Sequence, residues 1–501
     1  MIQPLGSTSR ICVALGFSGA DRLLEHARCE VEAGESFLEF RLDHLDAPEQ
    51  GVRAIETLLG ESPECTVIAT CRRRQNQGRF NGSVEEQIRI LNAAVQAGAR
   101  AVDVEIETAE SPGVRLEFFR GRAALMLSYH NFEGTPAMET VLHRMTRVPA
   151  DAYKLVTTAR KPSDNSRVLS LARAHPRLPL VLLAMGETGF PSRVLSTLFG
   201  GRFTYAAPRS AEGTASGQVS ARQLRQMYRI GKLPRTAKVY GVIADPVRHS
   251  ISPAVHNRAF QARRIDALYL PFLVPPAQLR DFMTAAAELP LAGFSVTIPL
   301  KQKILRYLDV VEPMARRIGA VNTVWRRAGK WRGANTDAEG VRVPLERHLR
   351  LAKSSVLLVG NGGAARGAAF ALADAGARIS IVGRNPDRVR ALAKVCGAEP
   401  LLREQAEARH FDALVHSTPL GMSPHLDECF FSNHIPADVV FDLVYNPLDT
   451  LLLRRAREQG LTVVRGAEMF LEQAARQFEI WTGQPAPRTV MEKTVWEALA
   501  G

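Results

Sequence analysis

The chain has 501 residues, too many for one hydrophobic core, so we expect two or three domains, each with enough apolar residues to fold by itself. Its first residues hold no long apolar segment, and no run of about eighteen uncharged apolar residues follows, which argues against export or membrane spanning and favours a cytoplasmic protein. The net charge of +13 is spread among acids without a basic run, so an ordinary basic surface or small anionic substrates explain it, and nucleic acid is the least favoured partner.

From residue 11 to about residue 206, short apolar runs alternate with segments of helical periodicity. The eight runs are ICVALGF, SFLEFRL, CTVIATC, RAVDVEI, AALMLSY, DAYKLVT, LVLLAM and RFTYAA. Strands that alternate with amphipathic helices indicate βα units, and eight units in about 200 residues match a small closed (β/α)8 barrel, the TIM-barrel fold. A basic, proline-containing connection near residues 231–237 predicts a boundary, so the first domain is expected to span residues 1–230.

Polar residues gather where these predicted strands end. Active sites of such barrels lie at the carboxyl ends of the strands, so the pattern marks a candidate site. The residues at or near these ends are Glu39, Arg41, Thr70, Arg72, Asp103, Glu105, His130, Lys154 and Gly186.

Lys154 interrupts the sixth apolar run, DAYKLVT. A lysine that forms an imine must be an uncharged amine, which needs desolvation or cationic neighbours, together with a separate proton shuttle. His130 could move the proton, while nearby arginines such as Arg72 and Arg193 could bind a carboxylate and disfavour protonation of the amine. On these residues alone, a catalytic lysine and a buried, paired structural lysine are supported about equally.

The motifs EFRLD, TCR, SYHNFEGTP, AYKLV and GTASGQ occur in this order along the predicted strands. Together they resemble the type I 3-dehydroquinate dehydratases, over roughly residues 10 to 225. The resemblance implies a metal-free elimination of water from 3-dehydroquinate, in which Lys154 forms an imine with the ring ketone and His130 moves the α-proton and assists loss of hydroxide. It also implies a set of substrate-binding residues, namely Glu39, Arg41, Arg72, Arg193, Thr214 and Gln218.

One position departs from that family. A glutamate usually follows the arginine of the T-x-R motif by four residues and helps to orient the histidine, whereas this chain has Asn76 there and no acid before Glu85. Asn76 could hold the imidazole by a hydrogen bond but could not stabilise its cation. We therefore expect a slower or pH-shifted dehydratase.

The second half begins with KVYGVIADPVRHSISPAVHNRAF, which predicts a strand, a polar loop and a helix. The strands ALYLPFLV and LAGFSVTIPLK follow, so this part is a second α/β unit. Further on, SSVLLVGNGGAARGAAFALADAG predicts a strand, a glycine-rich turn and a helix, and RISIVGRN predicts the next strand. This order is typical of a Rossmann-like dinucleotide-binding sheet.

The glycine-rich turn predicts a dinucleotide site. Gly360, Gly362 and Gly363 would let backbone amides approach a pyrophosphate at the start of a helix. The second strand ends in Arg384, helped by Arg388, instead of in an acid that would hold an NAD ribose, which points to the 2′-phosphate of NADP. The alternative is a tight strand-to-helix turn with surface arginines.

Small polar and ionisable residues gather in HSISP, SVTIPLK, GAVNT and GANTDAEG. Serines of the first motif could bind a carboxylate, Asn322 and Thr297 could bind hydroxyls, and Lys301 with Asp337 could form a proton-transferring pair beside a ketone that receives hydride. Taken singly, each of these residues is an ordinary turn or capping residue. Their joint presence favours a site for a hydroxylated carboxylic acid.

These motifs, with the later STPLGM, DLVYNP and GAEMFLEQ, resemble shikimate dehydrogenase over residues 238 to 498. The resemblance implies Lys301 and Asp337 as the catalytic pair and six residues in contact with shikimate, namely Ser250, Ser252, Thr297, Asn322, Tyr445 and Gln473. The implied NADP contacts are Gly360, Asn361, Gly362, Gly363, Ala364, Gly383, Arg384, Asn385, Arg388, Leu443 and Gly466.

Two positions depart mildly from the dehydrogenase family. Ser295 stands where many relatives have asparagine, and Asn361 replaces a small residue of the glycine turn. Both changes concern affinity more than the type of reaction.

The two resemblances fit together, because the product of the first reaction is the substrate of the second. The whole chain is similar to the fused dehydratase and dehydrogenase of the shikimate pathway and would form shikimate from 3-dehydroquinate with NADPH. The expected domains are the barrel (1–230), a substrate-binding domain (238–345, completed by 467–501) and an NADP-binding domain (346–466). Two alternatives stay open: a quinate dehydrogenase in the second half, and one half that has lost its chemistry and serves as a binding or regulatory module.

The expected partners are therefore small molecules, with neither nucleic acid nor membrane. The six cysteines form no C-x-x-C pair, which predicts free thiols and neither a disulfide framework nor a metal site. The sequence does not determine the oligomeric state.

Overall fold

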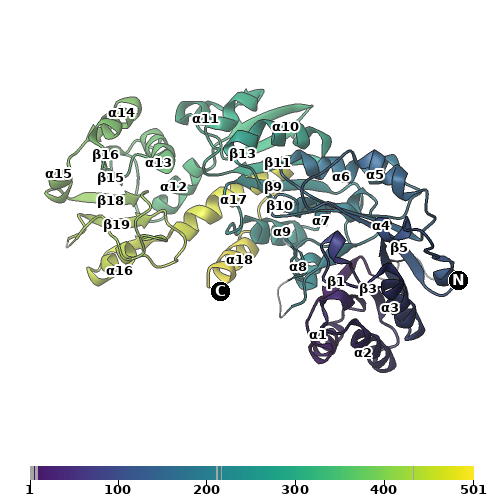
Figure 1. Cartoon of the computed structure of the whole chain (residues 1–501). Helices are drawn as coiled ribbons and strands as arrows, with labels where there is room; N and C mark the ends of the chain where they lie inside the picture. The colour runs from purple at the N-terminus through teal and green to yellow at the C-terminus, as the bar shows by residue number, and fades with distance from the viewer. Residues whose placement is uncertain (1–4, 6–8, 210–212, 216, 433, 501) are drawn as a thin grey trace. The chain divides into compact units, whose positions relative to one another are not determined.

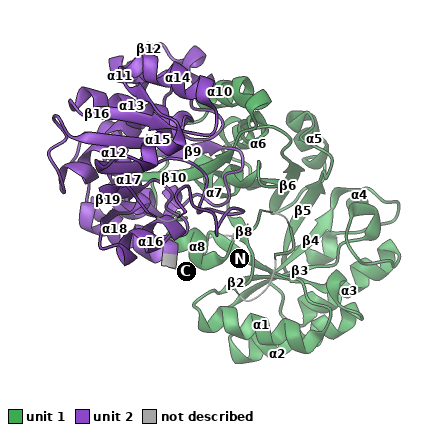
Figure 2. Ribbon diagram, turned by 90° about the vertical axis from the view of Figure 1, so that its left-hand side faces the viewer, with its two compact units in different colours: residues 1–238, 266–290 green, residues 239–265, 291–501 purple. Residues whose placement is uncertain are grey.

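The computed structural model describes residues 5, 9–209, 213–215, 217–432 and 434–500. Ser216 of the GTASGQ motif lies outside these residues. The chain forms two compact units (Figure 2). Unit 1 comprises Met1–Lys238 and Asp266–Pro290, and unit 2 comprises Val239–Ile265 and Leu291–Gly501.

Unit 1 contains an eight-stranded parallel barrel, as the sequence predicts. The sheet runs in the order β7-β6-β5-β4-β3-β2-β1-β8. At its seam β7 and β8 lie next to each other, and Arg202 N donates a 2.8 Å hydrogen bond to Leu180 O. The strands are β1 (Ile11–Leu15), β2 (Phe37–Arg41), β3 (Thr66–Thr70), β4 (Ala101–Glu105), β5 (Ala124–His130), β6 (Ala152–Thr158), β7 (Leu180–Met185) and β8 (Thr204–Ala206).

Helices alternate with these strands and pack around the barrel (Figure 1). Local sequence sets their limits: Ser83 and Glu86 form a capping box that begins α3. The helices are α1 (Ala20–Glu32), α2 (Pro48–Glu61), α3 (Val84–Gln96), α4 (Ile106–Ala109), α5 (Met138–Met145), α6 (Ser163–Ala174), α7 (Phe190–Phe199) and α8 (Ala221–Gln226), with short 3-10 turns η1 (Leu42–His44), η2 (Arg74–Asn76) and η3 (Glu117–Phe119).

The interior of the barrel holds one apolar cluster, so it is a packed core below the polar strand ends. Phe37, Ile68, Met126 and Val181 belong to it and are almost fully buried. Residues 266–290 add β10 (Ala267–Leu273), η4 (Pro276–Gln278) and α10 (Leu279–Glu288) to this unit, and α10 packs against α6.

Unit 2 begins with a mixed sheet, in which β9 pairs in parallel with β11. β11, β13 and β14 then pair antiparallel, and β12 adds to β14 in parallel. The elements are β9 (Lys238–Ala244), α9 (Ser252–Ala262), β11 (Leu291–Val296), η5 (Lys303–Tyr307), β12 (Val310–Val311), α11 (Pro313–Ile318), β13 (Thr323–Arg327), β14 (Lys330–Ala334), α12 (Asp337–Glu346), α17 (Gly466–Thr482) and α18 (Arg488–Ala500).

The rest of unit 2 is a six-stranded parallel sheet of order β17-β16-β15-β18-β19-β20, as expected for a Rossmann-like domain (Figure 1). The chain leaves β15 on one side and returns as β18 on the other, so the strand order reverses between them. The elements are β15 (Ser355–Val359), α13 (Gly363–Asp374), β16 (Arg378–Val382), α14 (Pro386–Cys396), β17 (Glu399–Pro400), α15 (Arg403–Glu407), β18 (Phe411–His416), β19 (Ala437–Asp442), α16 (Leu451–Glu458) and β20 (Thr462–Val464).

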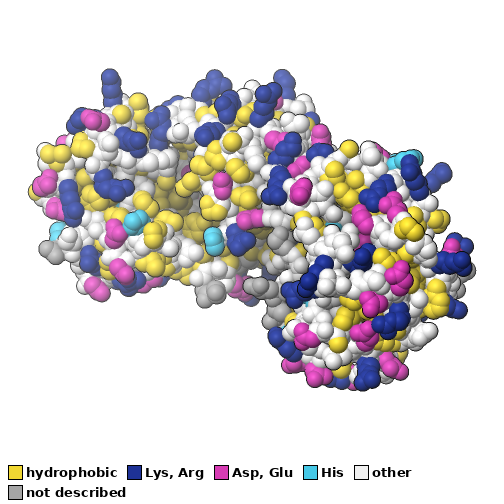
Figure 3. All heavy atoms as spheres, viewed as in Figure 1, with side chains coloured by type: hydrophobic (Ala, Val, Ile, Leu, Met, Phe, Trp, Pro, Cys, Tyr) yellow, Lys and Arg dark blue, Asp and Glu magenta, His cyan; other side chains and the backbone are white. Residues whose placement is uncertain are grey.

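Basic and acidic side chains are interspersed over the face shown in Figure 3. None of the described helices is both long and apolar enough to cross a membrane.

Candidate active sites

A cavity of about 230 Å³ opens among the strand ends of the barrel. It brings together every residue that the sequence predicts for the dehydratase site, although these residues come from distant parts of unit 1. Those that line it are Glu39, Arg41, Arg72, His130, Lys154, Arg193, Thr214 and Gln218.

Lys154 points into this cavity from β6 and is almost completely shielded from water, with 4% of its surface exposed. Its Nζ atom lies 2.9 Å from Asp103 Oδ2 and 3.2 Å from Glu39 Oε1. The same atom lies 4.1 Å from the centre of the Tyr205 ring, a cation–π distance. The amine is thus held between two carboxylates above an aromatic face.

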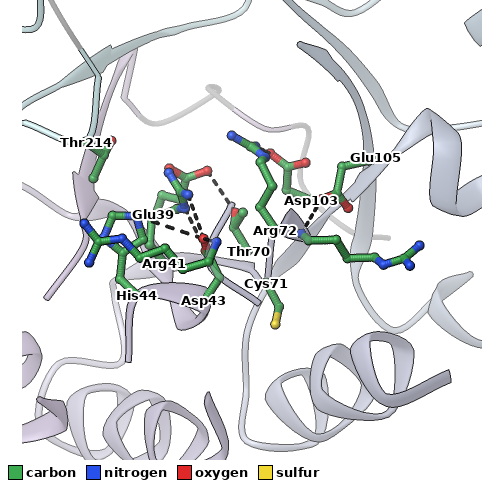
Figure 4. A network of polar contacts seen from close by, with 12 residues as sticks. Glu39, Arg41, Asp43, His44, Thr70, Cys71, Arg72, Asp103, Glu105 and Thr214 are labelled. Atoms are coloured by element: carbon green, nitrogen blue, oxygen red, sulfur yellow. Dashed lines mark hydrogen bonds and ion pairs between the residues drawn. The ribbon is translucent and has the colours of Figure 1, made fainter. Parts of the chain in front are cut away.

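The two carboxylates are themselves fixed by neighbours (Figure 4). Thr70 Oγ1 donates a 2.9 Å hydrogen bond to Glu39 Oε1, and Arg72 Nη2 lies 3.3 Å from Asp103 Oδ2. Burial opposes ionisation of Asp103, but Lys154 and Arg72 outweigh burial and hold the pKa of this carboxyl below its ordinary value. Asp103 therefore stays ionised beside the lysine.

The arginines of the cavity differ in how they are held. Arg41 makes two hydrogen bonds to Asp43, of 2.9 Å from Nε and 2.8 Å from Nη2 (Figure 4). Arg193 reaches the cavity from α7 with 1% of its surface exposed, and burial lowers its pKa to about 10. A buried guanidinium favours an anion that would share its burial, so Arg193 suits a substrate carboxylate.

His130 ends β5 and lines the cavity. Removal from water lowers its pKa well below the ordinary value, and the charges of Arg72, Lys154 and Arg41 lower it further. Within the described residues, its buried Nδ1 atom has no hydrogen-bond partner. The imidazole is therefore neutral near pH 7 and can accept a proton.

Asn76 does not take the place of the missing glutamate. It ends η2, and its Nδ2 atom donates a 2.8 Å hydrogen bond to Glu107 Oε2. The suggestion that Asn76 holds the imidazole of His130 is therefore wrong for this structure, because the carboxylate of Glu107 binds its amide instead. Gln77, the next residue, lines the cavity in a left-handed conformation with φ of 56°.

Three residues at the site are absent from the catalytic and substrate-binding set that the resemblance implies. Asp103 was visible as a strand-end acid, and its alternation with Ala101 in AVDVE places it on the interior face of β4. By sequence, Tyr205 is indistinguishable from an ordinary core aromatic residue of β8. Its buried hydroxyl has no hydrogen-bond partner among the described residues. Asp43 is the last residue of the EFRLD motif, and by sequence it resembles an ordinary turn residue.

In unit 2, the structure joins Lys301, Asp337 and Asn322. Lys301 Nζ lies 2.5 Å from Asp337 Oδ2, and Asn322 Nδ2 donates a 2.8 Å hydrogen bond to Asp337 Oδ1. Asp337 begins α12, where the helix dipole favours a negative charge, and the Asn322 amide is held in turn by Thr336. The lysine keeps a route to water, since 24% of its side chain is exposed.

The other residues predicted to contact shikimate make local contacts and, within the described part of the chain, do not bond to the Lys301–Asp337 pair. Ser250 Oγ accepts a 3.3 Å hydrogen bond from Ser252 N at the start of α9, and Gln473 Nε2 donates to Phe470 O within α17. The ring of Tyr445 packs against that of Phe470. Among the described residues, no hydrogen bond links these four side chains or Thr297 to the pair of Lys301 and Asp337.

Ser295, which replaces the asparagine of relatives, is buried and donates a 2.9 Å hydrogen bond to Gln477 Oε1. Gln477 Nε2 lies 3.3 Å from Asn322 O, so the serine, through Gln477, supports the backbone at Asn322, just before β13. This partner was not predicted, because Gln477 is 182 residues away in the sequence.

The glycine turn after β15 has the shape of a phosphate cradle. A Cβ atom added to Gly362 or Gly363 would meet nothing within 4 Å, so open space lies above the amides that begin α13. Gly360 has φ of +125°, which only glycine adopts easily, and Gly466 approaches the backbone of Val444 so closely that a Cβ atom would lie 2.3 Å from its oxygen. These features fit a dinucleotide pyrophosphate.

The loop after β16 completes the predicted cofactor region. Asn361 Nδ2 donates a 3.3 Å hydrogen bond to Asn385 O and covers Gly383, which explains the departure at residue 361 as a link between two loops. Arg384 and Arg388 are exposed and form no ion pair with any described residue, so both are free to bind an anion. Ala364 lies in the first turn of α13, and Leu443 N donates to His416 O.

Comparison with protein families divides the chain in the same way. The model of type I 3-dehydroquinase matches residues 11–233, and the shikimate dehydrogenase substrate-binding model matches residues 242–324. The shikimate/quinate 5-dehydrogenase model matches residues 345–422, and the C-terminal domain of shikimate 5'-dehydrogenase matches residues 466–495.

Individual relatives cover the chain in whole or in half. The chloroplastic bifunctional 3-dehydroquinate dehydratase/shikimate dehydrogenase of Arabidopsis thaliana is 34% identical over 96% of this chain and 83% of that protein. The shikimate dehydrogenase (NADP(+)) of Methanosarcina acetivorans is 42% identical over 52% of this chain and 99% of its own.

Solved structures resemble the second half. Shikimate dehydrogenase of Thermus thermophilus, in complex with NADP(H) and shikimate, has a TM-score of 0.50 and 35% identity and covers 52% of this chain and all of its own. A shikimate dehydrogenase in complex with NADP+ has a TM-score of 0.50 and 34% identity over 53% of this chain and 97% of its own. With a relative that spans nearly the whole chain, this protein belongs to the family of bifunctional 3-dehydroquinate dehydratase/shikimate dehydrogenases.

Proposed function

We propose that this protein dehydrates 3-dehydroquinate to 3-dehydroshikimate in its barrel and reduces that product to shikimate with NADPH in unit 2. The observation that carries the proposal is the barrel cavity, in which a buried lysine, a neutral histidine and four arginines converge. A structural lysine would need only its two carboxylates. A cavity lined by further cations and a proton acceptor is the arrangement that imine chemistry on an anionic substrate requires.

The dehydration begins at Lys154. Its Nζ atom, which Asp103 and Glu39 hold at 2.9 and 3.2 Å, passes a proton to the neutral imidazole of His130 and then adds to the ring ketone. Loss of water from this adduct gives an imine that acidifies the adjacent C–H bond. Hydrolysis of the imine at the end of the cycle consumes one water and restores the amine, so the net reaction releases one water.

We assign the proton transfers at carbon and oxygen to His130. Its lowered pKa keeps the imidazole neutral near pH 7, so it takes the α-proton and then returns a proton to the departing hydroxyl group. Arg193, with Arg41 and Arg72, would bind the substrate carboxylate, while Glu39, Thr214 and Gln218 would bind hydroxyls.

For the reduction, we assign the proton transfer to Lys301. Asp337 holds the ammonium at 2.5 Å, and Asn322 holds Asp337, so the pair can deliver a proton to the ketone oxygen and recover one from water. We assign binding of the substrate's carboxylate and hydroxyls to Ser250, Ser252, Thr297, Tyr445 and Gln473.

NADPH would supply the hydride for this step. The amides of Gly362 and Gly363 would hold its pyrophosphate, and the unpaired Arg384 and Arg388 would hold its 2′-phosphate. Arg384→Ala should raise KM for NADPH about tenfold and leave KM for NADH unchanged, since only NADPH carries the 2′-phosphate. Equal losses with both nucleotides would contradict this assignment.

The test of the proposed function is a coupled assay of the full chain. Purified protein supplied with 3-dehydroquinate and NADPH should accumulate shikimate through 3-dehydroshikimate, and the reverse reaction should oxidise shikimate with NADP. Lys154→Ala should block only the first step and Lys301→Ala only the second. A protein that forms no 3-dehydroshikimate would overturn the dehydratase assignment, and faster oxidation of quinate than of shikimate would favour a quinate dehydrogenase.

We further propose the division into domains 1–230, 238–345 with 467–501, and 346–466. The substrate-binding family model runs through residues 242–324 without a break, which supports the second domain. Limited proteolysis should cut first near residues 231–237. We also propose a cytoplasmic location and small-molecule partners only; the free cysteines suit a reducing compartment, and cell fractionation tests the location.

A further inference from the structure

A chain of hydrogen bonds is buried at the carboxyl end of the parallel sheet of unit 2. His416, the last residue of β18, lies at the centre of this network. Its Nδ1 atom lies 2.9 Å from Asp442 Oδ1, and its Nε2 atom lies 2.6 Å from Thr418 Oγ1. His416 and Asp442 are 1% and 0% exposed. Neither these residues nor Thr418 belongs to the predicted sites.

With a neutral imidazole, every hydrogen in this network of hydrogen bonds has one consistent place. Asp442 Oδ1 also accepts from Val444 N, and Asp442 Oδ2 accepts from Thr450 Oγ1, so the carboxylate only accepts. The Nδ1 atom of His416 must then carry the hydrogen, which leaves Nε2 to accept from the Thr418 hydroxyl. Thr418 Oγ1 is thereby free to accept from Leu420 N at 3.3 Å. The imidazole is a fixed link between a carboxylate and a loop hydroxyl.

That loop, residues 417–422, lies at the point where the order of the sheet reverses. Nucleotides bind parallel α/β sheets in the crevice at this point, here between the carboxyl ends of β15 and β18. Ser417 Oγ donates a 2.8 Å hydrogen bond to Val359 O, and a Cβ atom on Gly360 would lie 2.5 Å from Ser417 Oγ. The loop therefore packs directly against the glycine turn.

The Asp442 end of this hydrogen-bond network contacts two further segments near the predicted cofactor site. Thr450 begins α16, and its Cβ atom would lie 3.1 Å from a Cβ atom on Gly421 of the loop. Val444, which donates to Asp442, approaches Gly466 at the start of α17. Asp442 and His416 thus connect the segments that follow β18 and β19.

We propose that His416 is a positioning residue of the dehydrogenase, which holds the loop of residues 417–422 in the conformation that receives the nicotinamide nucleotide. The inference rests on the proposed function of unit 2. A partly satisfied buried polar network costs stability, whereas a fully satisfied one fixes a single geometry, and this one fixes the loop that packs against the glycine turn.

Two substitutions at His416 test its bonds to Asp442 and to Thr418 separately. The amide nitrogen of asparagine reaches the position of Nδ1 and keeps the bond to Asp442, but no atom reaches Thr418. Glutamine extends to the position of Nε2 and can accept from Thr418. His416→Asn should therefore raise KM for NADP about tenfold, and His416→Gln should raise it less.

Substitutions at Thr418, the hydrogen-bond partner of His416, give a matched pair of variants. Thr418→Val removes the hydroxyl at nearly constant volume and should reproduce the tenfold rise, while Thr418→Ser keeps the hydroxyl and should resemble the wild type. The double variant His416→Asn/Thr418→Val should be no worse than either single variant, because both remove one hydrogen bond. KM for shikimate and the dehydratase activity of the same chain should not change.

The measurements are shikimate oxidation with varied NADP and direct titration with NADP+ alone. KM for NADP within twofold of the wild type in Thr418→Val would overturn the proposal, as would equal losses for NADP and shikimate with a lower melting temperature, which indicate a purely structural role. Should His416→Asn fail to fold, the Thr418→Val and Thr418→Ser pair decides. A wild type that does not oxidise shikimate with NADP refutes the proposed function instead.

Discussion

Lys154 and Lys301 place the same side chain in contrasting surroundings. Lys154 is 5% exposed at its side chain and lies between two carboxylates inside a barrel, with an aromatic ring beneath it. Lys301 is 24% exposed and pairs with one carboxylate at the start of a helix. In the proposed function, the first lysine is a covalent nucleophile and the second transfers a proton.

The difference shows how surroundings select the chemistry of an amine. A nucleophilic lysine must lose its proton inside a dry cavity, so burial, further cations and a neutral imidazole that can take the proton surround it. A lysine that delivers a proton must remain charged and regain its proton from water, so partial exposure and one fixed carboxylate suffice. Four substitutions test this contrast.

The largest effect is expected for Lys154→Met. The variant cannot form an imine, so dehydratase kcat should fall about 10⁴-fold or more, while the dehydrogenase keeps its activity. Borohydride with 3-dehydroquinate should give a covalent adduct on the wild type, seen by mass spectrometry, and none on the variant. An adduct on the variant would place the nucleophile elsewhere.

Lys301→Met is the reciprocal change. Loss of the proton donor should lower dehydrogenase kcat by about 10²- to 10⁴-fold with a small change in KM, and the dehydratase should be unaffected. Steady-state rates of both reactions on one preparation give the comparison. If both activities fall together, the two lysines do not act independently.

Asp103→Asn keeps the size of the side chain and removes the charge that holds Lys154. Loss of a charged hydrogen bond should slow the dehydratase by about 10- to 100-fold. The pKa of Asp103 is lowered in the folded barrel, so the ionised group stabilises the fold above its unfolded pKa, and this contribution is lost as pH falls through the lowered value.

Melting curves at several acidic pH values test the second consequence. The wild-type barrel should lose stability below about pH 4, and the variant should lose less over the same interval. Asp427→Asn, at an exposed aspartate of unit 2 that forms no ion pair with any described residue, is a suitable control. An identical acid slope in Asp103→Asn and wild type would show that Asp103 does not carry the effect.

The smallest effect is expected for Asn76→Glu, which restores the family's carboxylate. Because Asn76 contacts Glu107, the new charge should be tested together with Glu107→Gln, which removes the repulsion. A carboxylate near His130 should favour its cation and shift the acidic limb of the dehydratase pH–rate profile to higher pH by about one unit. An unchanged profile in the double variant would show that this position does not act on His130.

Much of the fold and of the candidate sites follows from the sequence. Alternating apolar and amphipathic segments predict all eight barrel strands within a few residues, because their period depends only on local backbone geometry. The same holds for the glycine turn at residues 360–363, where the required backbone freedom is written into the residue type. Strand-end positions also predict which side chains line the barrel cavity.

The partners of those side chains were decided only by the tertiary structure. Asp103 meets Lys154 from 51 residues away, Ser295 meets Gln477 from 182 residues away, and Asn76 turns to Glu107 instead of His130. The bond between His416 and Asp442 likewise depends on the register of β18 beside β19. Sequence periodicity determines which face a residue occupies, but strand register and loop path determine which atoms come within hydrogen-bond distance, and the chemistry depends on those distances.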